Sequence, residues 1–404
     1  MHITFLLTQS LESPSGGGRY FPLAKALVGQ GHRVTIFALH HNYRELEQRR
    51  FVRDGVTVEY VGQMHVLKAD NRKTYFHPLA MIGITLIATL KLARAALREP
   101  GDLIHVAKGQ PMNGIAAWIA HRLRRVPVFL DSDDYEAVHN RFGGRWQQRI
   151  VAWFEDWIPS FASGITVGNT FIWNRHRALG YPPEKLVLVP NGVDRDAFAA
   201  LESADCARRL ELLQRELDLE EGQPVVVYVG SMSLVSHAVD LLLEAFAHVC
   251  ERLPDACLLL VGGGEDIDKL RLLAEQLGIA AHVRFVGRVP AEAVPLYYRL
   301  GTVSVDPRLD DLVAESSLSL KLVESIAAGV PCVTTDIGDR RLIAGEAGIA
   351  VPPGDARALA AGLLTVLENP EKASQMRQAA LALRDRYWWD VRVQDFASLY
   401  PASG

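Results

Sequence analysis

A lysine and a glutamate lie three positions apart in an amphipathic pattern near residue 320. Lys321 and Glu324 share one face of the helix that this pattern predicts, whereas Leu318, Leu322 and Ile326 recur every four residues and can face a core. A cation can bind an anionic group, and an ionised carboxylate accepts hydrogen bonds from hydroxyl groups. The two side chains are therefore placed to bind one polar ligand together.

The residues around this helix predict how it begins and ends. Ser316 and Ser317 stand just ahead of its first turn, where unpaired backbone N–H groups attract phosphate. Gly329 can end the helix in a left-handed conformation, and Pro331 prevents it from resuming. A short apolar strand over residues 331–335 follows. The segment thus joins a candidate phosphate site to a buried strand.

Strands alternate with helices in two successive series along the chain. The first series opens with a strand over residues 2–8, and the second opens with a strand over residues 224–230 and ends in the segment around Lys321. Such alternation is typical of parallel, doubly wound α/β sheets. A chain of 404 residues suits two domains. We interpret the charged segment 201–222 as containing the linker between them.

Ligands of open α/β sheets bind beyond the carboxyl ends of the strands. If the two series form domains that face each other, several polar loops meet around one crevice. These loops are 16–18, 131–134, 230–233, 262–264, 287–289 and 316–317. Neither series shows a clear Gly-x-Gly-x-x-Gly run with an acidic residue downstream, which disfavours a dehydrogenase.

The composition is that of a soluble globular protein with unevenly distributed charge. Hydrophobic residues make up 49% and charged residues 22% of the chain. Residues 1–200 hold 24 Lys and Arg against 17 Asp and Glu, whereas residues 201–404 hold 19 against 30. A basic first half suggests an anionic partner, such as a membrane surface or a phosphorylated acceptor, although scattered solvated charges explain the counts equally well. We expect no nucleic-acid partner.

Cysteine usage and the N-terminus both favour a cytoplasmic location. The four Cys are scattered without metal-like pairing, and no basic leader precedes the first strand. The apolar segment 78–97 is interrupted by Lys91 and Arg94, so we interpret it as a buried or inter-domain helix. Peripheral attachment to the inner face of the membrane is the alternative.

The segment around Glu324 resembles the donor-site helix of GT-B glycosyltransferases of the GT4 type, the glycosyl transferases group 1. The family's motif is Glu, seven residues, Glu and then a Gly-x-Pro turn, which Gly329 and Pro331 match. Glu324 falls on the second Glu, but Ser316 occupies the first position, with Glu315 one residue out of register. Shorter matches extend the resemblance over nearly the whole chain: Gly31–Val34, Val189–Asp194, Tyr228–Gly230, Phe285–Gly287 and Tyr387–Asp390.

This resemblance implies an α/β protein of GT-B architecture, in which two Rossmann-like domains face a central cleft. An acceptor-binding domain would span residues 1–200, and a C-terminal helix of about residues 388–404 would pack back on it. A nucleotide-sugar-binding domain would span residues 205–387.

The family neutralises the departing nucleoside diphosphate with basic side chains and helix N-termini. Its usual Arg after Gly230 is Ser231 here, and its usual Lys is best matched by His237. Lys321 is the leading replacement, because a subset of related transferases carries a similar Lys-Leu-x-Glu. Glu324 resembles the acid that accepts hydrogen bonds from the donor ribose. Further donor-binding candidates are Arg288, Val289, Arg308, Ser316, Ser317 and Leu318.

In the first domain, the family often has a catalytic His after the strand that faces the cleft. The comparable strand here is followed by Asp131-Ser132-Asp133-Asp134, and we assign the catalytic role to Asp133, with Asp134 as the alternative. A carboxylate could orient an acceptor hydroxyl or stabilise an oxocarbenium-like sugar. The same run could instead hold a divalent metal ion or cap the next helix. Candidates for the acceptor or phosphate loop are Gly16, Gly17, Gly18, Arg19 and Lys108.

We therefore expect a retaining, metal-independent glycosyltransferase with no cofactor besides its nucleotide-sugar donor, a UDP- or GDP-sugar. The acceptor would be a hydroxyl group of a glycan, a lipid-linked sugar or a small molecule. A non-catalytic GT-B subunit that binds a partner or a lipid is one alternative. A nucleotide-sugar epimerase of the same fold is another.

Overall fold

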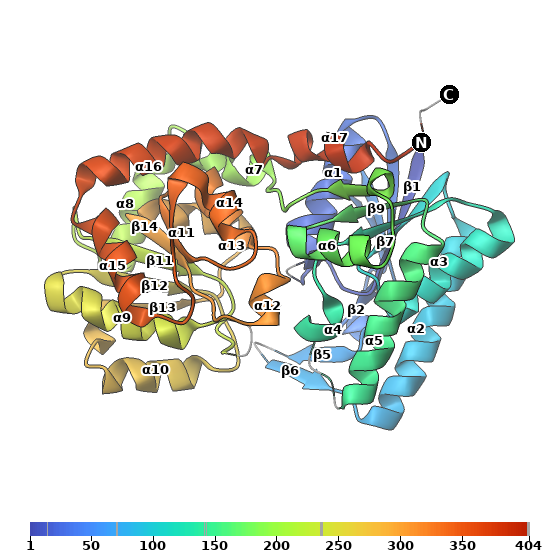
Figure 1. The fold of residues 1–404 in the computed structure, drawn as a ribbon, viewed down its shortest axis with the longest axis horizontal. Coiled ribbons are helices and arrows are strands. Elements are labelled where there is room, and N and C mark those ends of the chain that lie inside the picture. Colours follow the sequence, from blue (N-terminus) through green and yellow to red (C-terminus); the bar gives the residue numbers. More distant parts are fainter. Residues whose placement is uncertain (14, 70–71, 141, 143, 235–236, 402–404) are drawn as a thin grey trace. The chain divides into compact units, whose positions relative to one another are not determined.

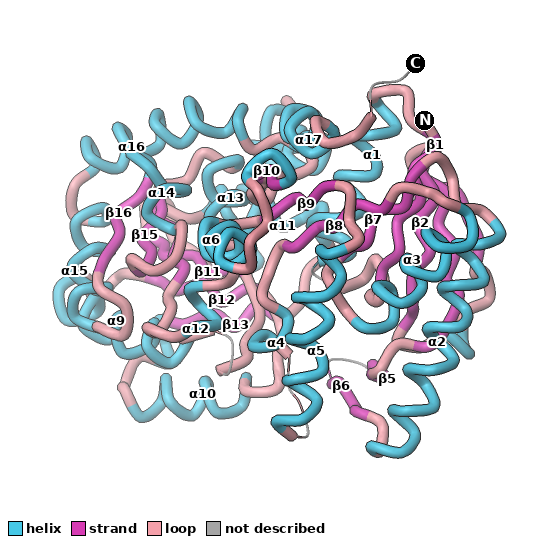
Figure 2. Tube along the Cα trace, turned by 45° about the vertical axis from the view of Figure 1, so that its right-hand side comes forward, coloured by secondary structure: helices cyan, strands magenta, loops and turns pink. Residues whose placement is uncertain are grey.

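The computed structural model describes residues 1–13, 15–69, 72–140, 142, 144–234 and 237–401 (Figures 1 and 2). Its chain divides into two units. The first contains residues 1–191, 316–318 and the C-terminal segment from Trp389, and the second contains residues 192–315 and 319–388. The sequence-based boundary at residues 200–205 thus lies inside the second unit. The charged segment that we interpreted as a linker forms α8 (Cys206–Glu216) of that unit.

The first unit is built on an eight-stranded sheet in the order β10-β9-β8-β7-β1-β2-β4-β3. All neighbours are parallel except β3 and β4, and a separate antiparallel hairpin pairs β5 (Val66–Ala69) with β6 (Arg72–Tyr75). The eight strands are β1 (His2–Leu7), β2 (Arg33–His40), β3 (Arg50–Arg53), β4 (Val56–Gln63), β7 (Leu103–Ala107), β8 (Val128–Ser132), β9 (Gly164–Val167) and β10 (Leu186–Leu188).

Helices cover both faces of this sheet, because successive side chains of a buried strand point to opposite sides. Phe5 belongs to the core beneath α1 (Phe21–Gly29) and α17 (Trp389–Ala397), whereas Leu6 belongs to the core beneath α2 (Pro78–Arg98) and α3 (Pro111–Arg124). The remaining helical segments are η1 (Gly16–Tyr20), η2 (Tyr43–Glu45), α4 (Glu136–His139), α5 (Arg145–Trp157), η3 (Ile158–Ser160), α6 (Thr170–Ala178) and η4 (Pro183–Lys185).

Helix α2 is the longest of the described helices of this unit. Its segment Ala80–Arg98 is long and apolar enough, by length and composition, to cross a membrane, a test that the core helix of a soluble protein also passes. Ala88, Leu92 and Ala96 of α2 lie in the core against the sheet, so the predicted helix is buried on this side. Its other side, with Ile82, Leu86 and Leu90, is exposed, so the prediction of a buried helix holds only in part.

The second unit is a six-stranded, wholly parallel sheet in the order β13-β12-β11-β14-β15-β16. The doubly wound alternation that the sequence predicts is therefore confirmed. Its strands are β11 (Val225–Val229), β12 (Cys257–Val261), β13 (Val283–Gly287), β14 (Val303–Asp306), β15 (Cys332–Thr335) and β16 (Gly348–Val351).

Two hydrophobic cores lie on the two faces of this second sheet. One core packs against α9 and α15, and the other against α11, α13 and α14 (Figure 1). The helical segments of the unit are α7 (Arg195–Phe198), η5 (Ala199–Glu202), α8, α9 (Val239–Arg252), α10 (Ile267–Gln276), η6 (Ala280–His282), η7 (Ala291–Ala293), α11 (Val294–Leu300), α12 (Leu312–Glu315), α13 (Leu320–Ala327), α14 (Arg340–Ala344), η8 (Gly345–Ala347), α15 (Ala356–Leu367), α16 (Pro370–Leu383) and η9 (Arg384–Arg386).

The helix that the sequence predicted around residue 320 is α13, and its two ends differ in how well they were predicted. Gly329 has a φ of +68° and follows the helix as expected. At the other end, Ser319 is the N-cap, and its hydroxyl accepts a hydrogen bond from the N–H of Leu322. Ser316 and Ser317 therefore lie just ahead of the first turn, as predicted, although the cap itself is Ser319.

Candidate functional site

The carboxyl end of β14 and the first two turns of α13 carry a cluster of charged side chains in the second unit. The carboxylate of Asp306 is buried and accepts a hydrogen bond from the hydroxyl of Ser319 at 2.6 Å. Three cations surround it: Nε of Arg340 at 3.1 Å, Nε of Arg308 at 3.5 Å and Nζ of Lys321 at 3.7 Å. Burial would raise the pKa of Asp306, but these cations hold it far below its ordinary value. The cluster therefore keeps a net positive charge.

Lys321 lies at the solvent-facing side of this cluster. Its side chain is 13% exposed, and its Nζ lies 3.4 Å from Nδ1 of His237 and 5.5 Å from the ring centre of Tyr228. Because an ammonium only donates, Nδ1 of His237 accepts this hydrogen bond, which leaves its Nε2–H as a donor. Burial lowers the pKa of Lys321 to about 8 against the opposing effect of Asp306. Burial and the Lys321 cation lower the pKa of His237, so the imidazole is neutral at pH 7.

Glu324 lies one turn further along α13 and is half-buried. The hydroxyl of Tyr298 donates a hydrogen bond to Oε2 of Glu324 at 3.2 Å. Burial raises the pKa of Glu324 to about 7, although this hydrogen bond and the Lys321 cation oppose the rise. A carboxylate of this kind can accept hydrogen bonds from ligand hydroxyls at neutral pH.

Glycines at the ends of two strands allow the backbone to approach Lys321 closely. A Cβ at Gly230, just after β11, would overlap Cε of Lys321. Gly262, just after β12, has a φ of +138°, and a Cβ there would overlap the carbonyl oxygen of Gly230. The side chain of Lys321 thus crosses directly over the backbone at the carboxyl edge of the sheet. Ser231, which follows Gly230 in the chain, is half-buried.

The first unit has its own buried charge cluster, beyond the carboxyl ends of β7 and β8. Nζ of Lys108 lies 3.2 Å from Oδ1 of Asp133, 3.1 Å from Oδ2 of Asp134 and 2.7 Å from Oε1 of Glu136. Lys108 itself has a left-handed backbone with a φ of +62°. The three carboxylates are close enough together to hold a metal ion. In this arrangement, however, the Lys108 ammonium already lies among them.

The acids of this cluster differ in the protonation that their surroundings favour. Burial, with Asp134 and Asp131 nearby, raises the pKa of Asp133 to about 7, although Lys108 opposes the rise. Burial would also raise the pKa of Asp134, but Lys108 and His139 hold it below its ordinary value. Asp133 can therefore take up and release a proton near neutral pH, whereas Asp134 stays ionised.

Two family models match the chain over most of its length. Residues 15–192 match the glycosyl transferase 4-like domain, and residues 211–382 match the glycosyl transferases group 1. The chain thus matches two glycosyltransferase domain models in succession, and each matched segment lies almost wholly within one unit of the structure.

Known proteins similar to this chain include enzymes named for transfer to inositol compounds. It is 35% identical to a phosphatidyl-myo-inositol mannosyltransferase of Mycobacterium tuberculosis over 220 residues, 53% of each chain, so it spans about half the length of that relative. It is 27% identical to a D-inositol 3-phosphate glycosyltransferase of Acidothermus cellulolyticus over 94% of this chain and 83% of the other. Among solved structures, Anabaena HepE in complex with UDP-glucose has the same fold, with a TM-score of 0.72 at 18% identity over 98% of each chain.

In the second unit, the structure brings together several of the predicted donor-site residues. Gly230, His237, Lys321 and Glu324 lie in one cluster, as their contacts show. Arg288 is exposed after β13, where a Cβ on Gly263 would lie 2.7 Å from its Nε, and Val289 is half-buried beside it.

The segment Ser316–Leu318 belongs with the first unit rather than with the donor cluster. The carbonyl oxygen of Ser316 accepts a hydrogen bond from Nδ2 of Asn169 at 3.1 Å, and the N–H of Leu318 donates to Oδ1 of Asp134 at 3.0 Å. Ser316 and Ser317 are both buried. The donor role that the family motif implies for this segment stays a prediction.

Two predicted acceptor contacts turn out to be engaged within the protein. All five N–H donors of Arg19 are used, by both carboxylate oxygens of Asp131, by the amide oxygen of Asn191 and by the carbonyl oxygens of Val189 and Pro190. Nζ of Lys108 is likewise surrounded by its three acids. The surroundings of Arg19 and Lys108 therefore do not support a direct contact with an acceptor.

Glycine is required at positions 16 and 17 by close packing within the loop itself. A Cβ at Gly16 would overlap the carbonyl oxygen of Ser10, and one at Gly17 would lie 2.6 Å from the carbonyl oxygen of Leu11. These glycines allow the loop to pack on itself. Gly18 follows them within η1.

Sequence reasoning missed three members of the donor cluster: Asp306, Arg340 and Tyr298. Asp306 could have been found from its position, because it is a charged residue that follows an apolar run. A carboxylate buried at such a place needs cations near it. Arg340 is 1% exposed, and its guanidinium also donates to the carbonyl oxygens of Ala314 and Ile337.

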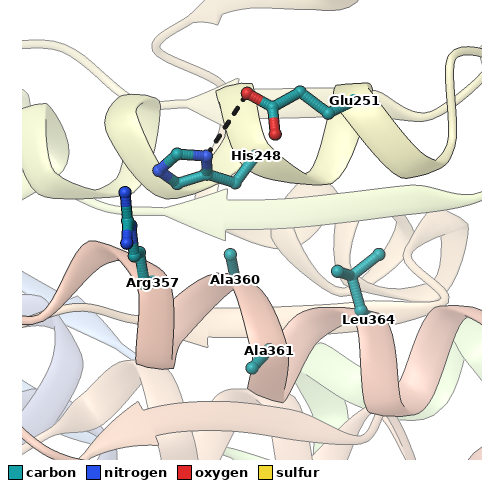
Figure 3. A pocket seen from close by; sticks show the side chains of 6 residues that line it. All are labelled: His248, Glu251, Arg357, Ala360, Ala361 and Leu364. Carbon is teal, nitrogen blue, oxygen red and sulfur yellow. Dashed lines mark ion pairs between the residues drawn. The ribbon is translucent and has the colours of Figure 1, made fainter.

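A hollow between α9 and α15 is separate from both clusters. It is lined by His248, Glu251, Arg357, Ala360, Ala361 and Leu364, and Figure 3 shows His248 turned toward Glu251, with 3.4 Å between Nδ1 and Oε1. None of these residues was predicted to bind substrate, and none contributes to the Asp306 or Lys108 cluster.

Proposed function

We propose that this protein transfers a sugar from a nucleotide-sugar donor to a hydroxyl acceptor, with the second unit binding the donor. The observation that carries this proposal is the cluster in which Arg308, Lys321 and Arg340 surround the single buried carboxylate of Asp306. Three cations against one anion leave about two positive charges. This excess suits a nucleoside diphosphate, whose negative charge grows as the sugar departs.

Each side chain at the surface of this cluster has a separate task. Lys321 and the Nε2–H of His237 bind the diphosphate. Glu324 accepts hydrogen bonds from the ribose hydroxyls, one turn away on the same helix. Arg288 and Val289 lie on the loop where the family holds the base. Gly230 supplies the close backbone approach that a phosphate needs.

The first unit binds the acceptor, and Asp133 acts on the acceptor hydroxyl or the transferring sugar. Transfer proceeds with retention by attack on the front face of the sugar, and the donor phosphate takes the proton of the acceptor hydroxyl. Retention is part of this proposal because of the GT4 resemblance. The buried acids around Lys108 supply negative charge beside an oxocarbenium-like sugar.

The reaction needs no metal ion in this proposal. Two groups among the described residues could hold a metal ion: Glu12 with His40 and His41, and Asp133 with Asp134 and Glu136. The second group, to which we assign the catalytic acid, surrounds the ammonium of Lys108. Side-chain cations at the donor cluster perform the charge neutralisation that a divalent ion would otherwise supply.

The donor is a UDP- or GDP-sugar and the acceptor is a hydroxyl of a glycan, a lipid-linked sugar or a small molecule. HepE has been solved with UDP-glucose, and the mycobacterial relative is named for a mannosyl transfer to a phosphatidylinositol. These names support a nucleotide-sugar donor and place a lipid headgroup among the acceptors to be tried.

Calorimetric titration with UDP-, GDP-, ADP- and dTDP-sugars, each with and without EDTA, tests the donor proposal. We expect one base to bind and EDTA to leave its Kd unchanged. Glu324→Gln should weaken binding by about tenfold, as expected for losing a hydrogen bond to a charged group. Glu244→Gln, on the exposed side of α9, is the matched control. The absence of binding for every nucleotide would refute the proposal, and binding that requires metal would refute metal independence.

Asp133→Asn should leave donor binding unchanged and lower turnover by about 100-fold or more, the range expected when one group that stabilises the charge of the transition state is lost. The Lys108 ammonium keeps Asp134 and Glu136 as partners, so the unit should still fold. Asp54→Asn is the control, because Asp54 is 49% exposed and its left-handed backbone suits Asn. Initial rates of sugar transfer measure the effect, and unchanged turnover in Asp133→Asn would remove Asp133 from the mechanism.

A further inference from the structure

The outward side of α5 carries a stripe of large apolar side chains. Trp146, Ile150 and Trp153 lie at intervals of four and three residues, so they share one helix face. The exposed fractions of the two tryptophans are both 56%, and that of Ile150 is 44%. Single exposed apolar residues are ordinary, but two tryptophans in one stripe are not, since Trp is usually buried to a large extent.

Helix α2 carries a second stripe of the same kind. Ile82, Leu86 and Leu90 follow one another at four-residue intervals, and the exposed fraction of each is above one half. The opposite side of the helix, at Ala88 and Leu92, is fully buried against the sheet. The exposed residues of α2 therefore point away from the core of the unit.

Helix α3 joins these two stripes into one layer. It contacts both α2 and α5, and Figure 2 shows it between them. The ring of Trp118 on α3 lies 6.1 Å from that of Trp157 on α5, and Trp157 stacks on Trp153 at 5.6 Å. We call the six residues Ile82, Leu86, Leu90, Trp146, Ile150 and Trp153 the docking face.

The docking face is bordered by basic residues and almost no acids. Residues 78–98 and 111–125 contain no Asp or Glu. On α5, Glu155 is buried and caps α4, while Asp156 pairs with Arg175. Arg98, at the end of α2, pairs with Glu59. The exposed arginines on the three helices and at the residue after α3 are Arg94, Arg98, Arg122, Arg124, Arg125, Arg145 and Arg149.

We propose that the docking face binds the surface of a bilayer that contains anionic lipid. Tryptophan combines an apolar ring with a polar N–H and is favoured at the boundary between headgroups and acyl chains. Arginines beside it attract anionic headgroups. The surface of an ordinary protein partner would not match an apolar face with a border of positive charge as well as an anionic bilayer does.

The chain lies on the membrane through this face and does not cross it there. Helix α2 satisfies the length requirement for a span, but its buried side forms the core under the sheet of the first unit. Insertion of α2 across a bilayer would remove Ala88, Leu92 and Ala96 from that core. Interfacial binding uses the exposed stripe alone and leaves the fold intact.

Co-sedimentation of the full chain with vesicles tests this proposal. We expect binding to vesicles of phosphatidylcholine mixed with phosphatidylglycerol, weaker binding to phosphatidylcholine alone, and loss of binding as salt rises. The triple variant Trp146→Gln, Ile150→Gln, Trp153→Gln should bind at least tenfold more weakly. The matched control is Leu272→Gln with Leu342→Gln, which removes two exposed leucines from the second unit.

A measurement on the unaltered protein complements the variants. Its tryptophan fluorescence should be quenched by anionic vesicles that contain brominated lipid, whether or not the triple variant folds. Absence of both sedimentation and quenching would overturn the proposal. A dimer seen by light scattering that the triple variant dissociates, without vesicle binding, would instead make the face an interface between two copies. These readouts need no nucleotide, so they fail or succeed independently of the proposed sugar transfer.

Discussion

Replacing Lys321 by methionine is expected to lower kcat/KM for the nucleotide sugar by about 100- to 1000-fold, the range found when one preorganised donor to a developing anion is removed. Lys321 is the half-buried cation of the donor cluster, and its Nζ is oriented by His237 and Asp306. The fold should survive, because the Asp306 carboxylate keeps Arg308 and Arg340 as partners. Steady-state kinetics with the donor identified by calorimetry measures the loss.

Lys269→Met is the matched control for this variant. Lys269 lies in the same unit, pairs with Asp266 at 2.7 Å and has a side chain that is 74% exposed. Lys269→Met removes one positive charge, as Lys321→Met does, but from a site exposed to solvent. Its kcat/KM should therefore stay within about twofold of that of the unaltered protein. Equal losses in the two variants would show that overall charge, rather than the position of Lys321, governs donor binding.

The same cluster should also give kcat/KM a bell-shaped dependence on pH. Below about pH 7, protonation of Glu324 removes an acceptor for the ribose hydroxyls, and above about pH 8, deprotonation of Lys321 removes a charge that binds the diphosphate. The alkaline decline belongs to Lys321, and it should therefore be absent from the residual activity of Lys321→Met.

Local patterns were sufficient to predict the elements of the fold. The glycine at the end of α13 and the strand after it follow from short stretches of sequence, and the structure has both. Leu322 and Ile326 are buried as expected, but Leu318, predicted on the same helix face, lies before the helix. Three of the four residues from 316 to 319 are serines, so the sequence did not identify the cap, which is Ser319. The charged segment 201–222 has the composition of a linker, but as α8 it packs one side on the second unit and exposes the other.

Contacts between distant residues could not be predicted in the same way. Asp306 and Arg340 are 34 positions apart, and Arg19 and Asp131 are 112 positions apart. Each pair forms because parallel strands bring their carboxyl ends to one edge, which the sequence indicates only in general terms. A buried ion pair also looks like two ordinary surface charges until the fold is known. Arg19 was therefore assigned to a ligand when its donors serve the protein itself.

Arg19→Met is expected to destabilise the first unit by about 3–5 kcal/mol, the cost of leaving one member of a buried ion pair without its partner. The side chains of Arg19 and Asp131 are 2% and 0% exposed, and they share two hydrogen bonds at 2.7 and 2.8 Å. The urea dependence of the unfolding free energy measures the effect. Arg33→Met is the control, because Arg33 is 66% exposed in its pair with Glu99 and should contribute less than about 1 kcal/mol.

The pH dependence of this loss separates an unpaired charge from lost packing. Burial would raise the pKa of Asp131, but Arg19 holds it below its ordinary value, so the pair stabilises the unaltered protein above about pH 4 and progressively less as the pH falls further. In Arg19→Met, burial acts unopposed by the guanidinium and the pKa of Asp131 rises. Acid then protonates the carboxylate and removes the free-energy cost of burying its charge. The difference in unfolding free energy between the two proteins should therefore narrow from pH 7 to pH 4. A difference that stays constant over that range would assign the loss to the missing guanidinium contacts with Val189 and Asn191 rather than to the charge of Asp131.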